Sequence, residues 1–323
     1  MIKYSFIVPV KKINEYIRES IPKILKINRD DYEIIIFPDE SSSETWTKTK
    51  QVATGPGGPA MKRSLAIKEA QGEVLIFIDD DAYPNIDFLK KLDAEFADQE
   101  IVAVGGPAIT PKHNSFQQKV SGAVFLSPLS GGCPERYVPI GEKRFVDDWP
   151  SVNLSVRKNV FEMVGGFDSN YWPGEDTLFC LELIKKTGKK ILYLPEALVY
   201  HHRREGFWRH MKQVGAYGLH RGHFARKFPK TSRRFKYFLP SLFLVYIVVG
   251  LIVSLQIEWL LWPYIAGLFI YVLALIKAFF DIRKHEKRSV AFVALPYIFG
   301  THIAYGSNFI KGLFKKQIKI SLR

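Results

Sequence analysis

The sequence predicts an α/β domain built on a mostly parallel sheet, followed by an α-helical membrane region. Two observations carry this prediction. Short runs of Ile, Val and Phe alternate with helical patterns in the first part of the chain, which is typical of a parallel sheet with helices on both faces. The last third consists mostly of Leu, Ile, Val, Phe, Tyr and Trp. With 323 residues, the chain is long enough for one large domain or two smaller ones.

The first two strands are each followed by polar residues. Residues 4–10 form a β-rich run that ends around Pro9, and a helical pattern over residues 16–25 follows it. Together they indicate a βα unit. A second buried strand is predicted over Tyr32–Phe37, with Asp39 just beyond its end. The polar residues that follow these two strands should therefore lie at the carboxyl edge of the sheet.

Three consecutive acids, Asp79, Asp80 and Asp81, follow the central strand predicted over residues 74–78. Ligands of parallel sheets bind at the carboxyl ends of the strands, where these acids and Asp39 are expected to gather. Adjacent carboxylates need a cation, a donor-rich ligand or bulk water. A Mg²⁺ or Mn²⁺ ion that bridges to a phosphate is one such partner. In an extended chain Asp79 and Asp81 point to the same side. The alternative is a solvated turn at the end of a strand.

A second acidic group lies further along the chain. Glu175 and Asp176 open an amphipathic helix, where the helix dipole favours negative charge by roughly 0.3 to 1 kcal/mol. Helix capping and a catalytic role are equally compatible with this position. Strand-like runs then lead into His201 and His202. A lone histidine is as often structural as functional, and for His202 that choice stays open.

The carboxyl-terminal third predicts membrane spans. Residues 238–255 and 259–280 match the ~20 residues that cross a bilayer, and the short link between them predicts a helical hairpin. A third apolar segment, residues 290–314, contains Pro and Gly. It fits either a third span or a re-entrant or interfacial helix. The positive-inside rule favours the second reading, because a third span would carry the basic tail across the membrane.

Charge is unevenly distributed along the chain. Lys and Arg number 46 against 32 Asp and Glu, and many of the basic residues lie between 201 and 236. Next to a span, such a cluster is expected to be cytoplasmic and attracted to anionic lipid. No nucleic-acid-binding signature and no cleavable signal peptide are recognisable. The predicted domains are a cytoplasmic α/β domain over residues 1–225, a basic linker over 226–237 and a membrane domain over 238–323.

In this order, the features resemble a membrane-anchored glycosyltransferase of family 2. The resemblance covers roughly residues 4–222. It rests on Pro9 in the first strand, Asp39 after the second, Arg63, the acidic triplet, GGFD at 165–168, GED at 174–176 and VYH at 199–201. The fold that this resemblance implies is GT-A, a Rossmann-like sheet flanked by helices.

The resemblance implies a donor-nucleotide group made up of Pro9, Asp39, Arg63, Asp79 and Asp80. Asp39 would accept hydrogen bonds from the nucleobase, and Arg63 would contact the same nucleotide. Asp79 would face the ribose and the nucleotide, as the first acid of a DxD motif. Asp80 would take a supporting part that the resemblance does not define.

The resemblance also implies a metal site and a catalytic base. Asp81 and His201 would hold Mg²⁺ or Mn²⁺ at the diphosphate, whose charge grows as it leaves. Asp176 would take the proton from the acceptor hydroxyl, and Glu175 would orient Asp176 or the acceptor.

The implied function is inverting, metal-dependent transfer of a sugar from a UDP- or GDP-linked donor. The acceptor would be a lipid-linked glycan or polyprenyl carrier at the cytoplasmic face of the cell membrane, in cell-surface polysaccharide or glycan biosynthesis. Pro38 and Glu40 replace the residues usual around Asp39, which leaves the base open. Gln213 does not begin the Q-x-x-R-W signature of processive synthases, so single-sugar transfer is expected. The alternative is a catalytically idle member that scaffolds a glycan-assembly complex.

Overall fold

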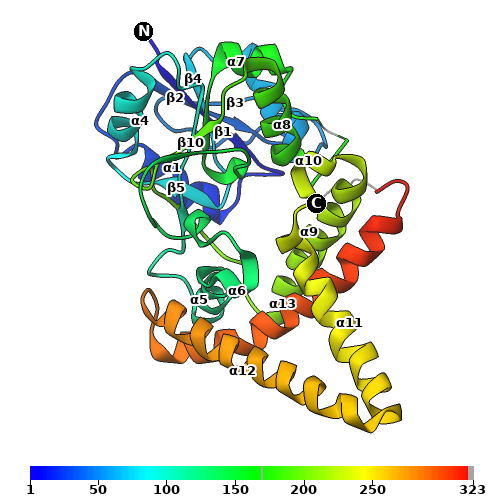
Figure 1. Ribbon diagram of the computed structural model, residues 1–323. Helices are drawn as coiled ribbons and strands as arrows, with labels where there is room; N and C mark the ends of the chain where they lie inside the picture. Colours follow the sequence, from blue (N-terminus) through cyan, green and yellow to red (C-terminus); the bar gives the residue numbers. More distant parts are fainter. Residues whose placement is uncertain (169, 319–323) are drawn as a thin grey trace. The chain divides into compact units, whose positions relative to one another are not determined.

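The computed structural model describes residues 1–168 and 170–318 (Figure 1). These residues form two compact units. The first unit comprises Met1–Pro111 and Val138–His202, and the second comprises Lys112–Tyr137 and Arg203–Ile318. Residues 203–225, which the sequence analysis assigns to the α/β domain, therefore lie in the second unit together with the apolar helices.

The first unit is built on an eight-stranded sheet with the order β3-β2-β1-β4-β9-β6-β10-β8. Its strands are β1 Tyr4–Pro9, β2 Tyr32–Phe37, β3 Thr49–Gln51, β4 Val74–Phe77, β6 Ala103–Gly105, β8 Arg144–Val146, β9 Leu154–Arg157 and β10 Ile191–Tyr193. The predicted strands at β1, β2 and β4 are confirmed and are buried almost throughout. Their Ile, Val and Phe side chains fill the core on both faces of the sheet.

The sheet is parallel on one side and mixed on the other. β1 pairs in parallel with β2 and with β4, and β2 pairs in parallel with β3. β9, however, lies antiparallel between β4 and β6, and β8 is antiparallel to β10. A buried apolar run does not encode the direction of its neighbours, so these three antiparallel pairings could not be predicted from the sequence.

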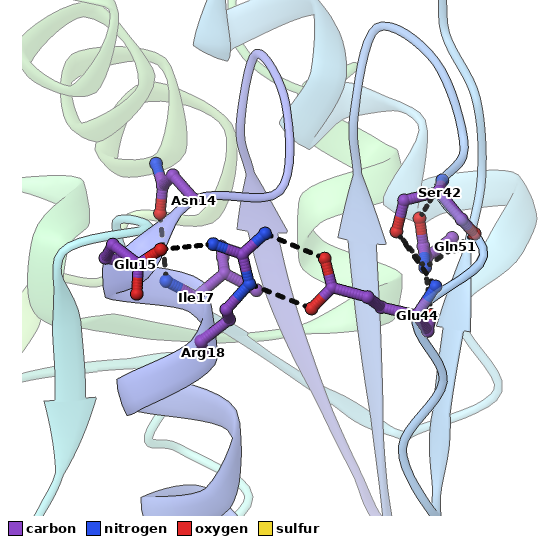
Figure 2. Close-up of polar contacts among 7 residues, drawn as sticks. All are labelled: Asn14, Glu15, Ile17, Arg18, Ser42, Glu44 and Gln51. Atoms are coloured by element: carbon purple, nitrogen blue, oxygen red, sulfur yellow. Dashed lines mark hydrogen bonds and ion pairs between the residues drawn. The ribbon is translucent and has the colours of Figure 1, made fainter.

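Six helices cover this sheet among the described residues. They are α1 Glu15–Ile24, α2 Pro59–Ser64, α3 Ala66–Glu69, α4 Phe88–Phe96, α7 Lys158–Val164 and α8 Glu175–Thr187. Asn14 begins α1 by accepting the backbone N–H of Ile17 at 2.9 Å, as an N-cap should. Figure 2 shows how Arg18 of the same helix reaches both oxygens of Glu44, each at 2.9 Å. These bonds tie α1 to the loop that follows β2.

A second, three-stranded sheet has the order β5-β11-β7. Its strands are β5 Ala82–Pro84, β7 Ala108–Ile109 and β11 Val199–His201. β5 pairs antiparallel with β11, with Ala82 opposite His201. Because Ala82 directly follows the acidic triplet, this pairing carries His201 to the triplet across more than a hundred residues of sequence.

The second unit is helical. Its helices are α5 Phe116–Ala123, α6 Pro128–Gly131, α9 Phe207–Lys227, α10 Pro229–Ser232, α11 Phe235–Gln256, α12 Leu261–Arg283 and α13 Arg288–Phe314. Short 3₁₀ turns complete the chain at Val124–Leu126, Pro134–Arg136, Ser151–Asn153 and Glu258–Leu260. Three of the described helices, α11, α12 and α13, are long and apolar enough to cross a membrane. α13 runs without a break through Pro296, so this segment does not reverse direction as a re-entrant loop would.

Helix α9 packs against α13 through glycines. A Cβ added at Gly222 would overlap the carbonyl oxygen of Phe309, and one added at Gly218 would overlap that of Tyr305. Only a residue without a side chain lets the two backbones approach this closely. At Gly215 the nearest atom is the Asn308 side-chain amide nitrogen, 3.0 Å away, which belongs to a side chain and not to the backbone.

This packing predicts that Gly222→Ala destabilises the protein by at least about 1–3 kcal/mol, because overpacking forces the backbones apart. The matched control is Gly215→Ala in the same helix, which should cost clearly less. The measurement is the melting temperature of the purified protein in detergent. Equal melting temperatures for the two variants would contradict the packing described for α9.

Candidate active site

The acidic triplet occupies the turn between β4 and β5. The backbone N–H of Ala82 donates to the carbonyl of Asp79 at 3.1 Å and closes this turn. Asp80 accepts a 2.7 Å hydrogen bond from the side-chain amide of Asn14. Its carboxylate is therefore attached to the start of α1. This contact gives Asp80 the definite structural role that the sequence left open.

Asp79, Asp81 and His201 come together as a group. Each offers one ligand atom, and these three atoms all lie within 4.8 Å of one another. The His201 Nε2 atom is 3.1 Å from a carboxylate oxygen of Asp81. Two carboxylates and an imidazole suit Mn²⁺ well and Mg²⁺ through the carboxylates, so the donor set fits a hard divalent cation. Asp79, expected to contact the nucleotide, lies close enough to share that cation.

Arg63 connects this group to the acidic pair of α8. Its guanidinium donates to a carboxylate oxygen of Asp79 and, at 3.1 Å, to one of Glu175. Only 3% of the Arg63 surface is exposed, and the Cζ atom of its guanidinium lies 5.8 Å from the centre of the Phe167 ring. A buried cation between two carboxylates holds both in place. Contact between Arg63 and a nucleotide stays a prediction.

Glu175 and Asp176 differ in their surroundings. Glu175 is buried, whereas Asp176 is partly exposed. One Asp176 oxygen accepts the backbone N–H of Thr177 at 2.8 Å, and the other accepts that of Ser151 at 3.3 Å. The helix-capping interpretation thus holds for Asp176 in part. It does not exclude a reactive role, because these bonds fix the orientation of an accessible carboxylate.

Burial, together with the neighbouring Asp176 carboxylate, raises the pKa of Glu175 to about 8, and the Arg63 charge opposes this rise. The unfolded chain releases the same proton near pH 4.5. The folded state therefore binds more protons between these two values, so stability should fall as the pH rises through this window, by at most about 1.4 kcal/mol per pH unit.

Glu175→Gln removes this titration but keeps an acceptor for Arg63. We expect the melting temperature of the Gln variant, relative to that of the unchanged protein, to increase between pH 5 and pH 8. Differential scanning fluorimetry across this range measures the difference. Glu182→Gln, on the same helix but with an exposed side chain, is the control. If the melting temperatures of Glu175→Gln and of the unchanged protein vary with pH in parallel, the burial of Glu175 does not make stability depend on pH.

Asp39 lies beyond the end of β2, where it meets a residue that the sequence analysis did not select. The ammonium group of Lys62 forms an ion pair with Asp39 and donates at 2.6 Å to the carbonyl of Val10. Lys62 is only 2% exposed. Pro9 is the last residue of β1 and is buried. Lys62 thus fastens the ends of β1 and β2 together beneath Asp39.

Two residues of this region were missed for different reasons. Asn14 stands just before an amphipathic helix and is recognisable as an N-cap, but its bond to Asp80 depends on the tertiary fold. Lys62 carries no sequence signal, because a lysine in a helical pattern is normally solvated. His202, whose role was open, lies 3.0 Å from a carboxylate oxygen of Glu19 on α1, and its role stays open.

The first unit therefore gathers the predicted residues at one edge of its sheet. Buried Arg63 joins a group suited to a divalent cation to the acidic pair of α8, of which Asp176 is partly exposed. Such an edge can hold a phosphate-bearing ligand through a cation and offer a base to a second substrate.

The fold is that of the GT-A glycosyltransferases. The chain superimposes on the mannosyltransferase PcManGT from Pyrobaculum calidifontis, solved in complex with GDP-Man and Mn²⁺, with a TM-score of 0.56 at 16% identity. The aligned region covers 98% of this chain and 88% of that protein.

Sequence comparison narrows the class. The family model for glycosyl transferase family 2 matches residues 5–143. A dolichyl N-acetyl-alpha-D-glucosaminyl phosphate 3-beta-D-2,3-diacetamido-2,3-dideoxy-beta-D-glucuronosyltransferase of Methanococcus voltae is 25% identical over 96% of this chain and 97% of its own length. A glucosyl-dolichyl phosphate glucuronosyltransferase of Haloferax volcanii is 26% identical over 59% of this chain and 63% of its own length. The chain is a glycosyltransferase whose residues 5–143 match the family 2 model, and three helices that are apolar enough to span a membrane follow the matched region.

Proposed function

We propose that this protein is an inverting, metal-dependent glycosyltransferase that moves a sugar from a nucleotide donor to a lipid-linked acceptor in glycan biosynthesis. One observation carries the proposal. The group of Asp79, Asp81 and His201 lies at the same sheet edge as the acidic pair of α8, and Arg63 contacts both. A donor held by the first group can therefore present its sugar to a base of the second.

The donor nucleotide binds along the ends of β1, β2 and β4. Asp39 accepts hydrogen bonds from the base, at a position that Lys62 fixes. Asp79 and Asp81, with His201, would hold Mg²⁺ or Mn²⁺. When bound, this cation supplies positive charge to the diphosphate as the bond to the sugar breaks. The PcManGT structure, which holds GDP-Man and Mn²⁺, supports a nucleotide sugar and a divalent cation as ligands of this fold.

Asp176 serves as the general base. It is the accessible member of the acidic pair, and two backbone N–H groups hold its carboxylate. It removes the proton from the acceptor hydroxyl while the hydroxyl oxygen forms a bond to the anomeric carbon. The bond from that carbon to the diphosphate breaks in the same displacement, and the nucleoside diphosphate leaves. A single displacement inverts the configuration at this carbon.

The acceptor is a lipid-linked glycan or polyprenyl phosphate at the cytoplasmic face of the cell membrane. Two relatives whose names give a sugar-bearing dolichyl phosphate support this class, one of them over nearly the whole chain. Basic residues flank the proposed spans at Arg233, Arg234, Arg283 and Lys284, which supports a cytoplasmic catalytic unit.

Lys62→Met should weaken donor binding by roughly ten-fold, about 1.4 kcal/mol, because Asp39 loses the partner that fixes its carboxylate. The control is Lys68→Met, which replaces an exposed lysine in the neighbouring helix α3. Titration of the purified protein with UDP or GDP and Mn²⁺ measures the effect. If Lys62→Met binds the preferred nucleotide as tightly as Lys68→Met does, Lys62 does not position Asp39 for the base.

The experiment that tests the function is a donor screen. Purified full-length protein in lipid is incubated with Mn²⁺, a panel of UDP- and GDP-sugars and a polyprenyl phosphate or polyprenyl-linked sugar. We expect release of one nucleoside diphosphate and a lipid product of inverted configuration. Binding of a nucleotide without any turnover across the panel would instead favour the catalytically idle scaffold. A product of retained configuration would contradict Asp176 as a single-displacement base.

A further inference from the structure

Helix α13 is the third helix that is long and apolar enough to span, yet α9 covers it along much of its length. The contacts begin at the ring of Phe207, whose centre is 4.9 Å from that of Tyr297. They end where His223 Nδ1 lies 3.0 Å from the carbonyl oxygen of Lys315. The covered stretch of α13 is roughly 27 Å long at 1.5 Å per residue, close to the ~30 Å thickness of a hydrocarbon core.

α9 itself is unsuited to hydrocarbon. It is not among the described helices that could cross a membrane. Exposed charges lie near both of its ends, at Arg209, Lys212, Arg226 and Lys227, and Arg221 interrupts the remainder. If α13 crossed the bilayer, α9 would have to cross beside it, because glycine contacts fasten the two backbones together. Several arginines and lysines within a bilayer are strongly unfavourable.

The free face of α13 lies on the other side of the helix from α9. Its exposed apolar residues lie within one narrow stripe at 100° per residue, together with two half-buried isoleucines: Phe292, Pro296, Phe299, Ile303, Ile310 and Phe314. Phe292, Phe299 and Phe314 are 69%, 43% and 79% exposed. A continuous apolar stripe with a basic layer opposite is the pattern of a helix that lies in the plane of a membrane surface.

The hairpin contacts α13 near the start of α11 and near the middle of α12. Phe238 and Ser241 of α11 contact α13, with ring centres of Phe238 and Phe309 4.8 Å apart and the Ser241 hydroxyl donating to the Gly306 carbonyl at 3.0 Å. On α12, the Tyr271 hydroxyl is 2.9 Å from Nδ1 of His302. Closer to the turn, α11 and α12 contact each other, as at Tyr246 and Tyr264. α13 thus crosses α11 near the end that carries basic residues, and it meets α12 about halfway along that helix.

We infer that α13 lies in the headgroup layer with its phenylalanine stripe on the hydrocarbon, that α9 covers its opposite face, and that only the α11–α12 hairpin crosses the membrane. The partner of this surface is the bilayer interface. Both the segment before α11 and the end of α13 then lie on the same side of the membrane. This inference concerns topology and does not depend on the proposed reaction.

Depth measurements distinguish the two arrangements. Single cysteines are placed at Phe292, Phe299 and Phe314 in full-length protein with Cys133→Ser and Cys180→Ala, labelled with a fluorophore and reconstituted into vesicles that contain nitroxide lipids. A helix in the surface plane should give three equally shallow labels. A span would place Phe299→Cys near the bilayer centre and the other two labels near opposite surfaces, and that result would overturn the inference.

Sidedness gives a second, independent readout. An impermeant maleimide is applied to sealed vesicles of one orientation that carry Lys230→Cys, Gln256→Cys or Lys316→Cys. Lys230→Cys and Lys316→Cys should react from the same side, and Gln256→Cys, at the end of α11, from the other. Reaction of Lys316→Cys on the side of Gln256→Cys would show that α13 crosses. Reaction of all three on one side would show that the hairpin does not.

Discussion

Asp176→Asn should lower kcat by about 10²–10⁴-fold while leaving nucleotide binding nearly unchanged, the usual range for loss of a general base. Asparagine matches aspartate in shape, and its oxygen can still accept the N–H of Thr177. It cannot take a proton from an acceptor hydroxyl. The measurement is steady-state turnover with the donor identified by the screen, together with the dissociation constant of the nucleoside diphosphate.

The control for Asp176→Asn is Glu182→Gln, which neutralises an exposed acid on the same helix. This variant should keep the turnover of the unchanged protein. If Asp176→Asn retains turnover within a few-fold of the control, the base lies elsewhere. Glu175 would then be the next carboxylate to test, since burial does not prevent it from moving on substrate binding.

Asp81→Asn should lower kcat/KM by about 10²-fold or more, because a neutral ligand weakens the hold on the cation that assists departure of the diphosphate. Asp81 is buried, and its carboxylate lies 3.1 Å from His201. The same substitution should abolish the increase in melting temperature that Mn²⁺ and nucleotide give together. This thermal readout reports binding even where no turnover occurs.

Asp87→Asn is the matched control for Asp81→Asn, since Asp87 is an exposed acid just beyond β5. The control should respond to Mn²⁺ and nucleotide as the unchanged protein does. An undiminished response in Asp81→Asn would rule Asp81 out as a metal ligand. A lower melting temperature of Asp81→Asn in the absence of Mn²⁺ and nucleotide would instead indicate damage to the turn. The affinity of the folded protein for Mn²⁺ then distinguishes such damage from the loss of a metal-binding carboxylate.

Local patterns were sufficient for the parts of the fold that are buried on both faces. β1, β2 and β4 are short apolar runs, and a run of this kind has few alternatives to a central strand. The position of the polar residues after these strands, at the carboxyl edge of the sheet, follows from the direction of the chain alone. This is why Asp39 and the acidic triplet could be placed at one edge before their distances were known.

Long-range pairings lay beyond such patterns. The run before His201 is recognisable as a strand, but nothing in its composition indicates β5 as its partner, and this pairing brings His201 to Asp81. Helix α9 also escaped prediction. Glycine and histidine make up much of the face that α9 packs on α13, beside Phe207 and Met211, so the usual helical period of apolar side chains is weak. The reason why this segment forms a helix is apparent only from its packing on α13.

Asn14 serves two requirements with one side chain. Its amide oxygen caps α1, and its amide nitrogen holds Asp80. Aspartate would cap the helix equally well but would set two carboxylates against each other, and serine or threonine would cap it without a group that reaches Asp80. Helix N-caps ordinarily accept Asn, Asp, Ser or Thr, but at this position only asparagine makes both hydrogen bonds. A residue outside the substrate's reach is thus restricted by a pair of bonds as tightly as a ligand would be.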